Sequence, residues 1–174
     1  HSYSSAASDV YKRQDISIEF HSLSKTANMT GWRVGSAVGN PDLINALMRV
    51  KSNIDSGLSQ AIQEMGIEAL SLSNEWLDSN NNIYKNRRDK VVATLQEIGL
   101  DAKAPDATLY IWTRVPEGYT SASFTEKLLE EVNVVVTPGS GYGTAGEGFI
   151  RLSLTIPDDQ IDEGLKRLSK FTLK

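Results

Sequence analysis

The sequence predicts an α/β protein whose first part is mainly helical and whose second part alternates strands with helices. Three observations support this prediction: short stretches in which polar and apolar residues alternate, longer stretches in which apolar residues recur every three or four positions, and a change of pattern after Gly99. Beyond Gly99 the expected order is β-α-β-β-α, which favours a compact sandwich with the helices on one sheet face. The 174 residues suffice for one ordinary domain or two small ones.

Two strands and three helices are expected before Gly99. Asn40 can cap a helix, because its side chain accepts a backbone hydrogen bond and Pro41 suits the first helical position. The expected strands span 15–20 and 32–39, and the expected helices span 40–51, 59–72 and 74–98. Two of these helices have apolar stripes that we expect to be buried: Leu43, Ile44, Leu47 and Met48, then Ile62, Met65 and Leu70.

After Gly99 the same patterns predict shorter elements. The expected strands span 108–115, 133–138 and 148–154, and the expected helices span 123–132 and 157–171. Two pairs of like charges, Arg87/Arg88 and Glu130/Glu131, are expected on solvated helix faces.

The composition excludes several classes of function. A net charge of −4 and a pI near 5.2 argue against a surface for nucleic acid or anionic membrane. The absence of cysteine excludes disulfides and thiolate metal sites, and two histidines are too few for a zinc cluster. No apolar run approaches the length that spans a bilayer. We expect neither metal nor membrane as a partner.

Residues 1–14 differ from the rest of the chain. They have no apolar signal-peptide core and no clear periodicity. We therefore expect a non-native or disordered leader over 1–14.

The segment 22–35, SLSKTANMTGWRVG, is the most informative stretch. A single lysine at a strand end is usually a solvated surface residue, but Lys25 has chemically matched neighbours. Ser22 and Ser24 offer hydroxyl donors, and Arg33 offers a planar fork of donors that suits phosphate. Hydroxyl and guanidinium groups beside a lysine amine are what a pyridoxal phosphate (PLP) site requires, since the amine reacts with the aldehyde while the other groups hold the phosphate.

This segment resembles the cofactor-lysine signature of the class I/II aminotransferases, which are fold-type I PLP enzymes. The signature runs Ser-x-Ser-Lys and then Gly-x-Arg-x-Gly. The matching residues are Ser22, Ser24, Lys25, Gly31, Arg33 and Gly35. The resemblance implies that Lys25 is the catalytic residue that bonds to PLP, that Ser22 and Arg33 hold the cofactor phosphate, and that Ser24 also belongs to the cofactor site.

A second segment, 139–154, contains a formal G-x-G-x-x-G at Gly141, Gly143 and Gly146. A dinucleotide fingerprint must open a helix, whereas this one leads into an expected strand, so we do not interpret it as one. The segment is similar to the carboxyl-terminal substrate segment of the same family. That similarity implies that Arg151 binds the α-carboxylate of the substrate as a bidentate pair.

The resemblance covers residues 15–174 and matches the carboxyl-terminal half of the family. It implies that 15–85 is a remnant of the large PLP-binding domain with the start of a connecting helix, and that 86–174 is the small α/β sandwich domain. Segments 19–40 and 50–64 most resemble the LL-diaminopimelate aminotransferases of lysine biosynthesis. Aspartate, alanine or aromatic aminotransferases, a PLP lyase of the same fold and a non-enzymatic α/β binding module remain as alternatives.

The resemblance also implies partners and a location. Amino acids and 2-oxo acids would be the substrates, and the enzyme would be a cytoplasmic homodimer. The polar loop of residues 51–60 is either a simple connection or, as in the family, a segment near the partner's active site, in which case Asn53 and Ser56 are candidates for contacts across the dimer. In the family, the acid partner of the PLP ring nitrogen comes from segments before Lys25. We therefore expect the chain alone to be inactive, with the stripe around Leu43, Leu47, Ile62 and Met65 partly exposed.

Overall fold

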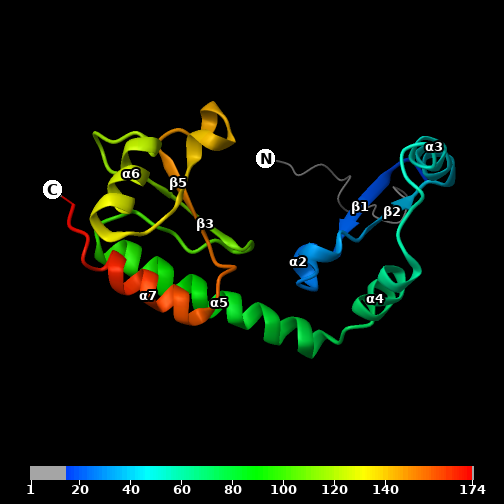
Figure 1. Ribbon diagram of the computed structural model, residues 1–174, viewed down its shortest axis with the longest axis horizontal. Coiled ribbons are helices and arrows are strands. Elements are labelled where there is room, and N and C mark those ends of the chain that lie inside the picture. The colour runs from blue at the N-terminus through cyan, green and yellow to red at the C-terminus, as the bar shows by residue number, and fades with distance from the viewer. Residues whose placement is uncertain (1–14, 174) are drawn as a thin grey trace. The chain divides into compact units, whose positions relative to one another are not determined.

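The computed structural model describes residues 15–173, which belong to two compact units (Figure 1). One unit ends at Leu77 and the other begins at Asp78, within a long helix. The expectation for residues 1–14 lies outside the described residues. The observed mixture of helices and strands confirms the α/β class.

The first unit contains a two-stranded antiparallel sheet of β1 (Ile18–Ser22) and β2 (Gly35–Gly39). The expected second strand was to begin at residue 32, but it begins at Gly35. The reason is local: Thr30–Trp32 forms a 3-10 helix (η2), and Arg33 follows in the left-handed conformation with φ 55. The left-handed conformation is not extended, so Arg33 cannot belong to the strand.

Three helices follow β2, as the sequence predicted. They are α3 (Pro41–Lys51), α4 (Gln60–Leu70) and α5 (Asn74–Glu97). The Asn40 side chain accepts hydrogen bonds from the backbone N–H groups of Asp42 and Leu43, which confirms the predicted cap.

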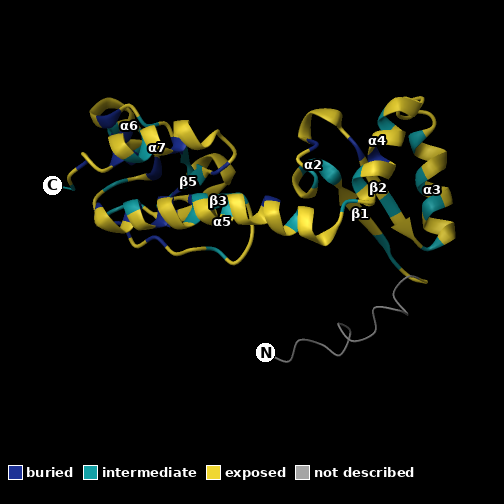
Figure 2. Cartoon of the chain, turned by 90° about the horizontal axis from the view of Figure 1, so that it is seen from below, coloured by how far each residue is buried: buried dark blue, intermediate teal, exposed yellow. Residues whose placement is uncertain are grey.

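The apolar stripes of α3 and α4 are largely exposed (Figure 2). The exposed fractions are 42% for Leu43, 53% for Met48, 38% for Met65 and 75% for Leu70. The expected burial is therefore wrong for these four side chains, and α3 has no buried residue at all. The two-stranded sheet is too small to cover two helices, so the partial exposure expected around Leu43 and Met65 is confirmed.

The second unit contains a three-stranded antiparallel sheet in the order β3-β5-β4. Its elements after α5 are β3 (Tyr110–Arg114), α6 (Ser121–Val132), β4 (Thr137–Pro138), β5 (Phe149–Ser153) and α7 (Asp158–Leu168). The strand expected over 133–138 is reduced to two residues, and Asn133 instead ends α6 in the left-handed conformation. Two 3-10 turns, η3 (Gly139–Tyr142) and η4 (Thr144–Gly146), connect β4 to β5.

The hydrophobic core of this unit lies on one face of the sheet. Ile111 of β3 and Ile150 of β5 are fully buried there. Helices α5, α6 and α7 cover that face through Leu95, Phe124 and Leu168, which confirms the expected sandwich. Alternate residues of the same strands point to the opposite face.

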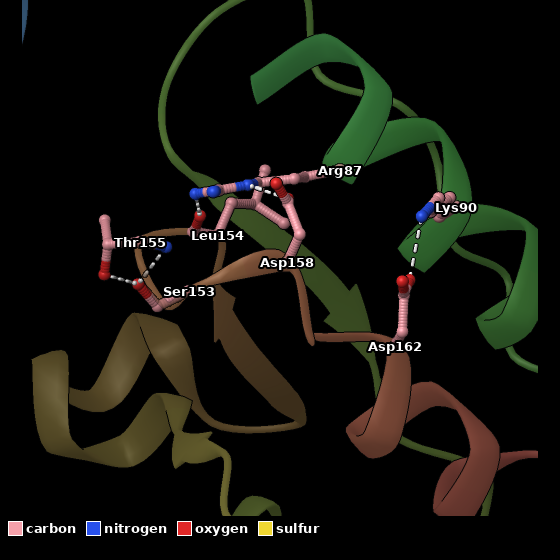
Figure 3. A network of polar contacts seen from close by, with 7 residues as sticks. All are labelled: Arg87, Lys90, Ser153, Leu154, Thr155, Asp158 and Asp162. Carbon is pink, nitrogen blue, oxygen red and sulfur yellow. Dashed lines mark hydrogen bonds and ion pairs between the residues drawn. The ribbon is translucent and has the colours of Figure 1, made fainter. Parts of the chain in front are cut away.

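Polar contacts join α5 to the end of β5 and the start of α7 (Figure 3). The Arg87 Nε donates to the Asp158 carboxylate at 2.6 Å, and its Nη1 donates to the Leu154 carbonyl at 3.0 Å. The Arg87 side chain is only 14% exposed. Lys90 and Asp162 form a second pair at 2.8 Å, but both side chains are about half exposed, so this pair contributes little.

The expectation that Arg87 and Arg88 lie on a solvated face is therefore wrong. Arg88 is 22% exposed and donates to the Pro105 carbonyl. Both guanidinium groups satisfy carbonyl groups of irregular backbone, which helix periodicity cannot reveal. Glu130 and Glu131 are exposed, as predicted.

Arg87→Met should lower the free energy of unfolding at neutral pH, because it leaves the Leu154 carbonyl without its partner, at a cost of about 1 kcal/mol. The hydrogen bond from Arg87 also holds the pKa of Asp158 below its ordinary value of 3.8. The stabilisation that comes from this lowered pKa is present above pH 3.8 and is lost as the pH falls through the lowered pKa. The difference in free energy of unfolding between the unmodified protein and Arg87→Met should therefore become smaller in acid. Denaturant unfolding at several pH values measures this.

Lys90→Met is the matched control for Arg87→Met. Lys90 lies on the next turn of α5, and this substitution removes its half-exposed ion pair with Asp162. The free energy of unfolding should change little. An equal loss of stability in the two variants would contradict the special role of Arg87.

Candidate functional site

The connection between β1 and β2 brings the predicted cofactor residues into one short loop. Ser22 lies opposite Gly35 in the sheet, and the Leu23 N–H donates to the Val34 carbonyl at 3.3 Å. A Cβ atom at Gly35 would lie 2.6 Å from the His21 carbonyl oxygen, so this close pairing requires glycine. The connection therefore starts and ends at neighbouring points of the sheet.

Lys25 lies in the single-turn helix α2 (Leu23–Thr26) and is exposed. Within the described residues its amine has no hydrogen bond or ion pair. Ser22 caps α2, with its Oγ accepting from the Ser24 N–H at 3.2 Å. The Ser22 hydroxyl proton therefore remains available to an anion. Ser24 is partly buried, and its carbonyl accepts from the Thr30 hydroxyl at 2.8 Å.

Arg33 occupies the left-handed region, with φ 55 and ψ 44. Its Nη1 donates to the Thr30 carbonyl at 3.2 Å, which directs the side chain back over the connection. No carboxylate among the described residues pairs with it, and the side chain is exposed. Strained backbone of this kind at a non-glycine residue is common at functional sites.

These donors fit PLP. The hydroxyl of Ser22 and the guanidinium of Arg33 have unused N–H and O–H groups for a phosphate, and the Lys25 amine is free for an aldehyde. A pocket of about 380 Å³ in the same unit is lined by Ser22, Leu23 and Val34 together with residues of α4. Neither Lys25 nor Arg33 lines that pocket, so Ser22 borders it while the two cationic side chains lie outside it.

Arg151 lies on β5, opposite Trp112 of β3 and Thr137 of β4. Its guanidinium carbon is 4.2 Å from the centre of the Tyr110 ring and 4.6 Å from that of Tyr142. Its Nε is buried and has no hydrogen-bond partner among the described residues. A buried unpaired donor on a cation is unusual, and it marks Arg151 as a candidate functional residue.

Tyr110 and Tyr142 were not predicted from the sequence to be neighbours of Arg151. The sequence did contain a pattern that places Tyr110 on the right face. Tyr110, Trp112 and Arg114 occupy alternate positions of β3 and so share the sheet face opposite the core. Tyr142 lies in a glycine-rich loop, and nothing local indicates where its ring points.

The formal G-x-G-x-x-G ends at Gly146 and leads into β5, as expected for a segment that is not a dinucleotide fingerprint. Asn53, one of the two residues expected near a partner subunit, donates to the Arg49 carbonyl at 2.5 Å and so closes the end of α3. Ser56 is exposed in the loop that follows.

Residues 15–173 contain no group of three or more histidine or acidic side chains placed to hold a metal ion. Over the same residues, no helix combines the length and the apolar character needed to cross a membrane.

Curated proteins that are similar to this chain include aminotransferases. LL-diaminopimelate aminotransferase of Dehalococcoides mccartyi strain CBDB1 is 56% identical, over 97% of this chain and 46% of that protein. The enzyme of the same name from Maridesulfovibrio salexigens is 52% identical, over 91% and 41%. The chain thus spans less than half the length of these curated relatives.

Solved structures give the same result. Substrate-bound BacF from Bacillus subtilis superposes with a TM-score of 0.82 at 35% identity, covering 90% of this chain and 40% of that one. An aminotransferase from Staphylococcus aureus gives 0.81 at 37% identity, covering 90% and 42%. The family model for aminotransferase class I and II, whose members use PLP, matches residues 3–168. With nearly the whole chain matched, this protein belongs to the class I and II aminotransferase family.

Proposed function

We propose that the protein containing this chain transfers an amino group from an amino acid to a 2-oxo acid with PLP as cofactor, and that the amino acid is LL-diaminopimelate. The observation that carries the proposal is the Lys25 amine, which has no partner within residues 15–173 and lies on the same short connection as Ser22 and Arg33. The substrate is inferred from relatives named LL-diaminopimelate aminotransferase at 56% and 52% identity.

Each candidate residue has a distinct role in this proposal. Ser22, Ser24 and Arg33 would hold the PLP phosphate, and Lys25 would bond to the cofactor aldehyde carbon. When bound, PLP supplies a conjugated ring that withdraws electrons from an attached amino acid. The Lys25 amine would also move the proton at the substrate Cα.

Arg151 would bind the substrate α-carboxylate. Its guanidinium is planar, always charged and able to donate two parallel hydrogen bonds. Its guanidinium lies over the Tyr110 and Tyr142 rings, and the buried Nε has no competing acceptor among the described residues.

The proposal extends to the organisation of the complete protein. Residues 15–85 would belong to the large cofactor domain and 86–174 to the small domain. The enzyme would be a cytoplasmic homodimer, with Asn53 and Ser56 near the partner's active site. Sedimentation of the complete protein tests the oligomeric state.

The experiment that tests the function is an exchange assay on the complete protein. It should convert LL-diaminopimelate and a 2-oxo acid to the corresponding oxo and amino acids. Exchange with aspartate, alanine or an aromatic amino acid in place of LL-diaminopimelate would identify that amino acid as the substrate. Loss of a substrate group without exchange would indicate a lyase, and no PLP-dependent reaction at all would indicate a binding module.

Borohydride reduction of the complete protein with PLP should attach the cofactor to Lys25, because its amine is exposed and unpaired among the described residues. Peptide mass spectrometry locates the added mass, and Lys25→Ala should abolish it. Lys51→Ala, which removes a lysine paired with Asp55 in the same unit, should retain the label. A label on another lysine would contradict the assignment.

Arg33→Ala should raise the PLP dissociation constant by about tenfold or more, because a hydrogen bond to a charged group contributes about 1.5–3 kcal/mol. Inorganic phosphate should compete with PLP in the unmodified protein. Arg49→Ala is the matched control, since Arg49 is also exposed in this unit. Equal PLP affinity in the three proteins would make Arg33 a structural residue only.

Arg151→Lys should weaken amino-acid binding by about tenfold or more while PLP binding stays nearly unchanged, because lysine cannot form the planar two-bond pair. Arg114→Lys is the control. Arg114 lies on the neighbouring strand β3, and its guanidinium also lies over an aromatic ring, that of Phe149. If Arg151→Lys weakened PLP and amino acid equally, Arg151 would belong to the phosphate site.

A further inference from the structure

The loop of residues 139–148 covers part of the sheet face that carries Arg151. We refer to this segment as the glycine loop. Its Tyr142 ring meets the Trp112 ring edge to face at 5.5 Å and lies 4.6 Å from the guanidinium carbon of Arg151. Trp112 stacks in turn on Phe149, with the ring centres 6.1 Å apart. The loop thus adds a ring to the anion site that the strands alone do not provide.

Close backbone contact holds the glycine loop at its two ends. A Cβ atom at Gly139 would lie 2.0 Å from the Gly146 carbonyl oxygen, and a Cβ atom at Gly146 would lie 2.1 Å from the Gly139 carbonyl oxygen. No side chain fits at either position. Only glycine at both positions allows the backbone at the two ends of the loop to approach so closely.

Glu147 fastens the same loop to the start of α6. Its carboxylate accepts hydrogen bonds from the Ser121 N–H and the Ser121 hydroxyl, each at 2.8 Å, and from the Gly148 N–H at 2.9 Å. The Ser140 N–H donates to the Ser121 hydroxyl at 3.3 Å. Ser121 is fully buried. These bonds, first the one from the Ser121 N–H, hold the pKa of Glu147 below its ordinary value.

The two aromatic neighbours of Arg151 differ in how they are held. Tyr110 belongs to β3, where strand pairing fixes it. Tyr142 is half exposed and depends on the glycine loop for its position. The orientation of the Arg151 guanidinium therefore depends on a loop that Glu147 and two glycines hold in place.

We propose that Tyr142 is a positioning residue for Arg151, and that Glu147 acts on Arg151 through Tyr142. The ring face of Tyr142 holds the guanidinium in the plane in which it accepts a carboxylate. Neither residue needs to touch the substrate. This proposal rests on the proposed role of Arg151 as the carboxylate-binding residue.

Tyr142→Leu in the complete protein tests the proposal. Loss of the cation–π contact should weaken the binding of succinate, an unreactive dicarboxylate, by about fivefold. The KM for the amino acid should rise by a similar factor, while kcat changes less than about twofold, as expected of a residue that acts on binding alone. Tyr142→Phe keeps the ring and should bind succinate like the unmodified protein.

The double variant Tyr142→Leu/Arg151→Lys decides whether the effect passes through Arg151. Tyr142→Leu should add little to the loss caused by Arg151→Lys, since contacting residues that act together are not additive. Two outcomes would overturn the positioning role of Tyr142 but leave the proposed role of Arg151 intact. In one, Tyr142→Leu weakens succinate binding equally with Arg151 and with Arg151→Lys; in the other, Tyr142→Leu has no effect while Arg151→Lys does. If Arg151→Lys itself leaves succinate binding unchanged, the proposed function of Arg151 fails as well.

Glu147→Gln tests the second half of the proposal. It keeps the shape of the side chain but removes the charge that strengthens three hydrogen bonds. Succinate binding should weaken, and the effect should vanish when Tyr142 is already leucine. An undiminished effect in the Tyr142→Leu background would show that Glu147 does not act through Tyr142. Circular dichroism verifies that each variant is folded.

Discussion

The alternation of side chains along β5 governs both faces of the three-stranded sheet. Because successive residues of a strand point to opposite sides, Ile150 enters the hydrophobic core while Arg151 faces away from it. The three helices cover the first face and exclude water from it. The second face is left free for a guanidinium group between aromatic rings, which could not exist inside the core. A shift of β5 by one residue would exchange these two environments.

The predicted cofactor residues depend on a different constraint, the antiparallel pairing of Ser22 with Gly35. This pairing closes the connection that carries Lys25 and Arg33 and returns both ends to one point of the sheet. Within the connection, the Thr30 side chain donates to the Ser24 carbonyl and the Arg33 side chain donates to the Thr30 carbonyl. No described carboxylate neutralises the two cations, so an anion can approach them.

The two units differ in how much apolar surface they bury. The second unit buries a continuous cluster that includes Leu95, Ile111, Phe124 and Leu168. The first unit leaves apolar side chains of α3 and α4 in solvent, such as Met48 and Leu70. Exposed apolar stripes on amphipathic helices normally indicate a surface that another part of a protein covers. The second unit therefore has the better-formed core.

The sequence alone determined what depends on near neighbours in the chain. Asn40 marked the start of a helix, and the predicted cofactor residues Ser22, Lys25 and Arg33 lie on one short connection, because caps and turns involve residues only a few positions apart. Only the tertiary structure decided which distant residues meet. Tyr110 and Tyr142 reach Arg151, and Arg87 reaches Leu154, through strand register and the path of loops. Those contacts form across the fold, so periodicity along the chain does not encode them.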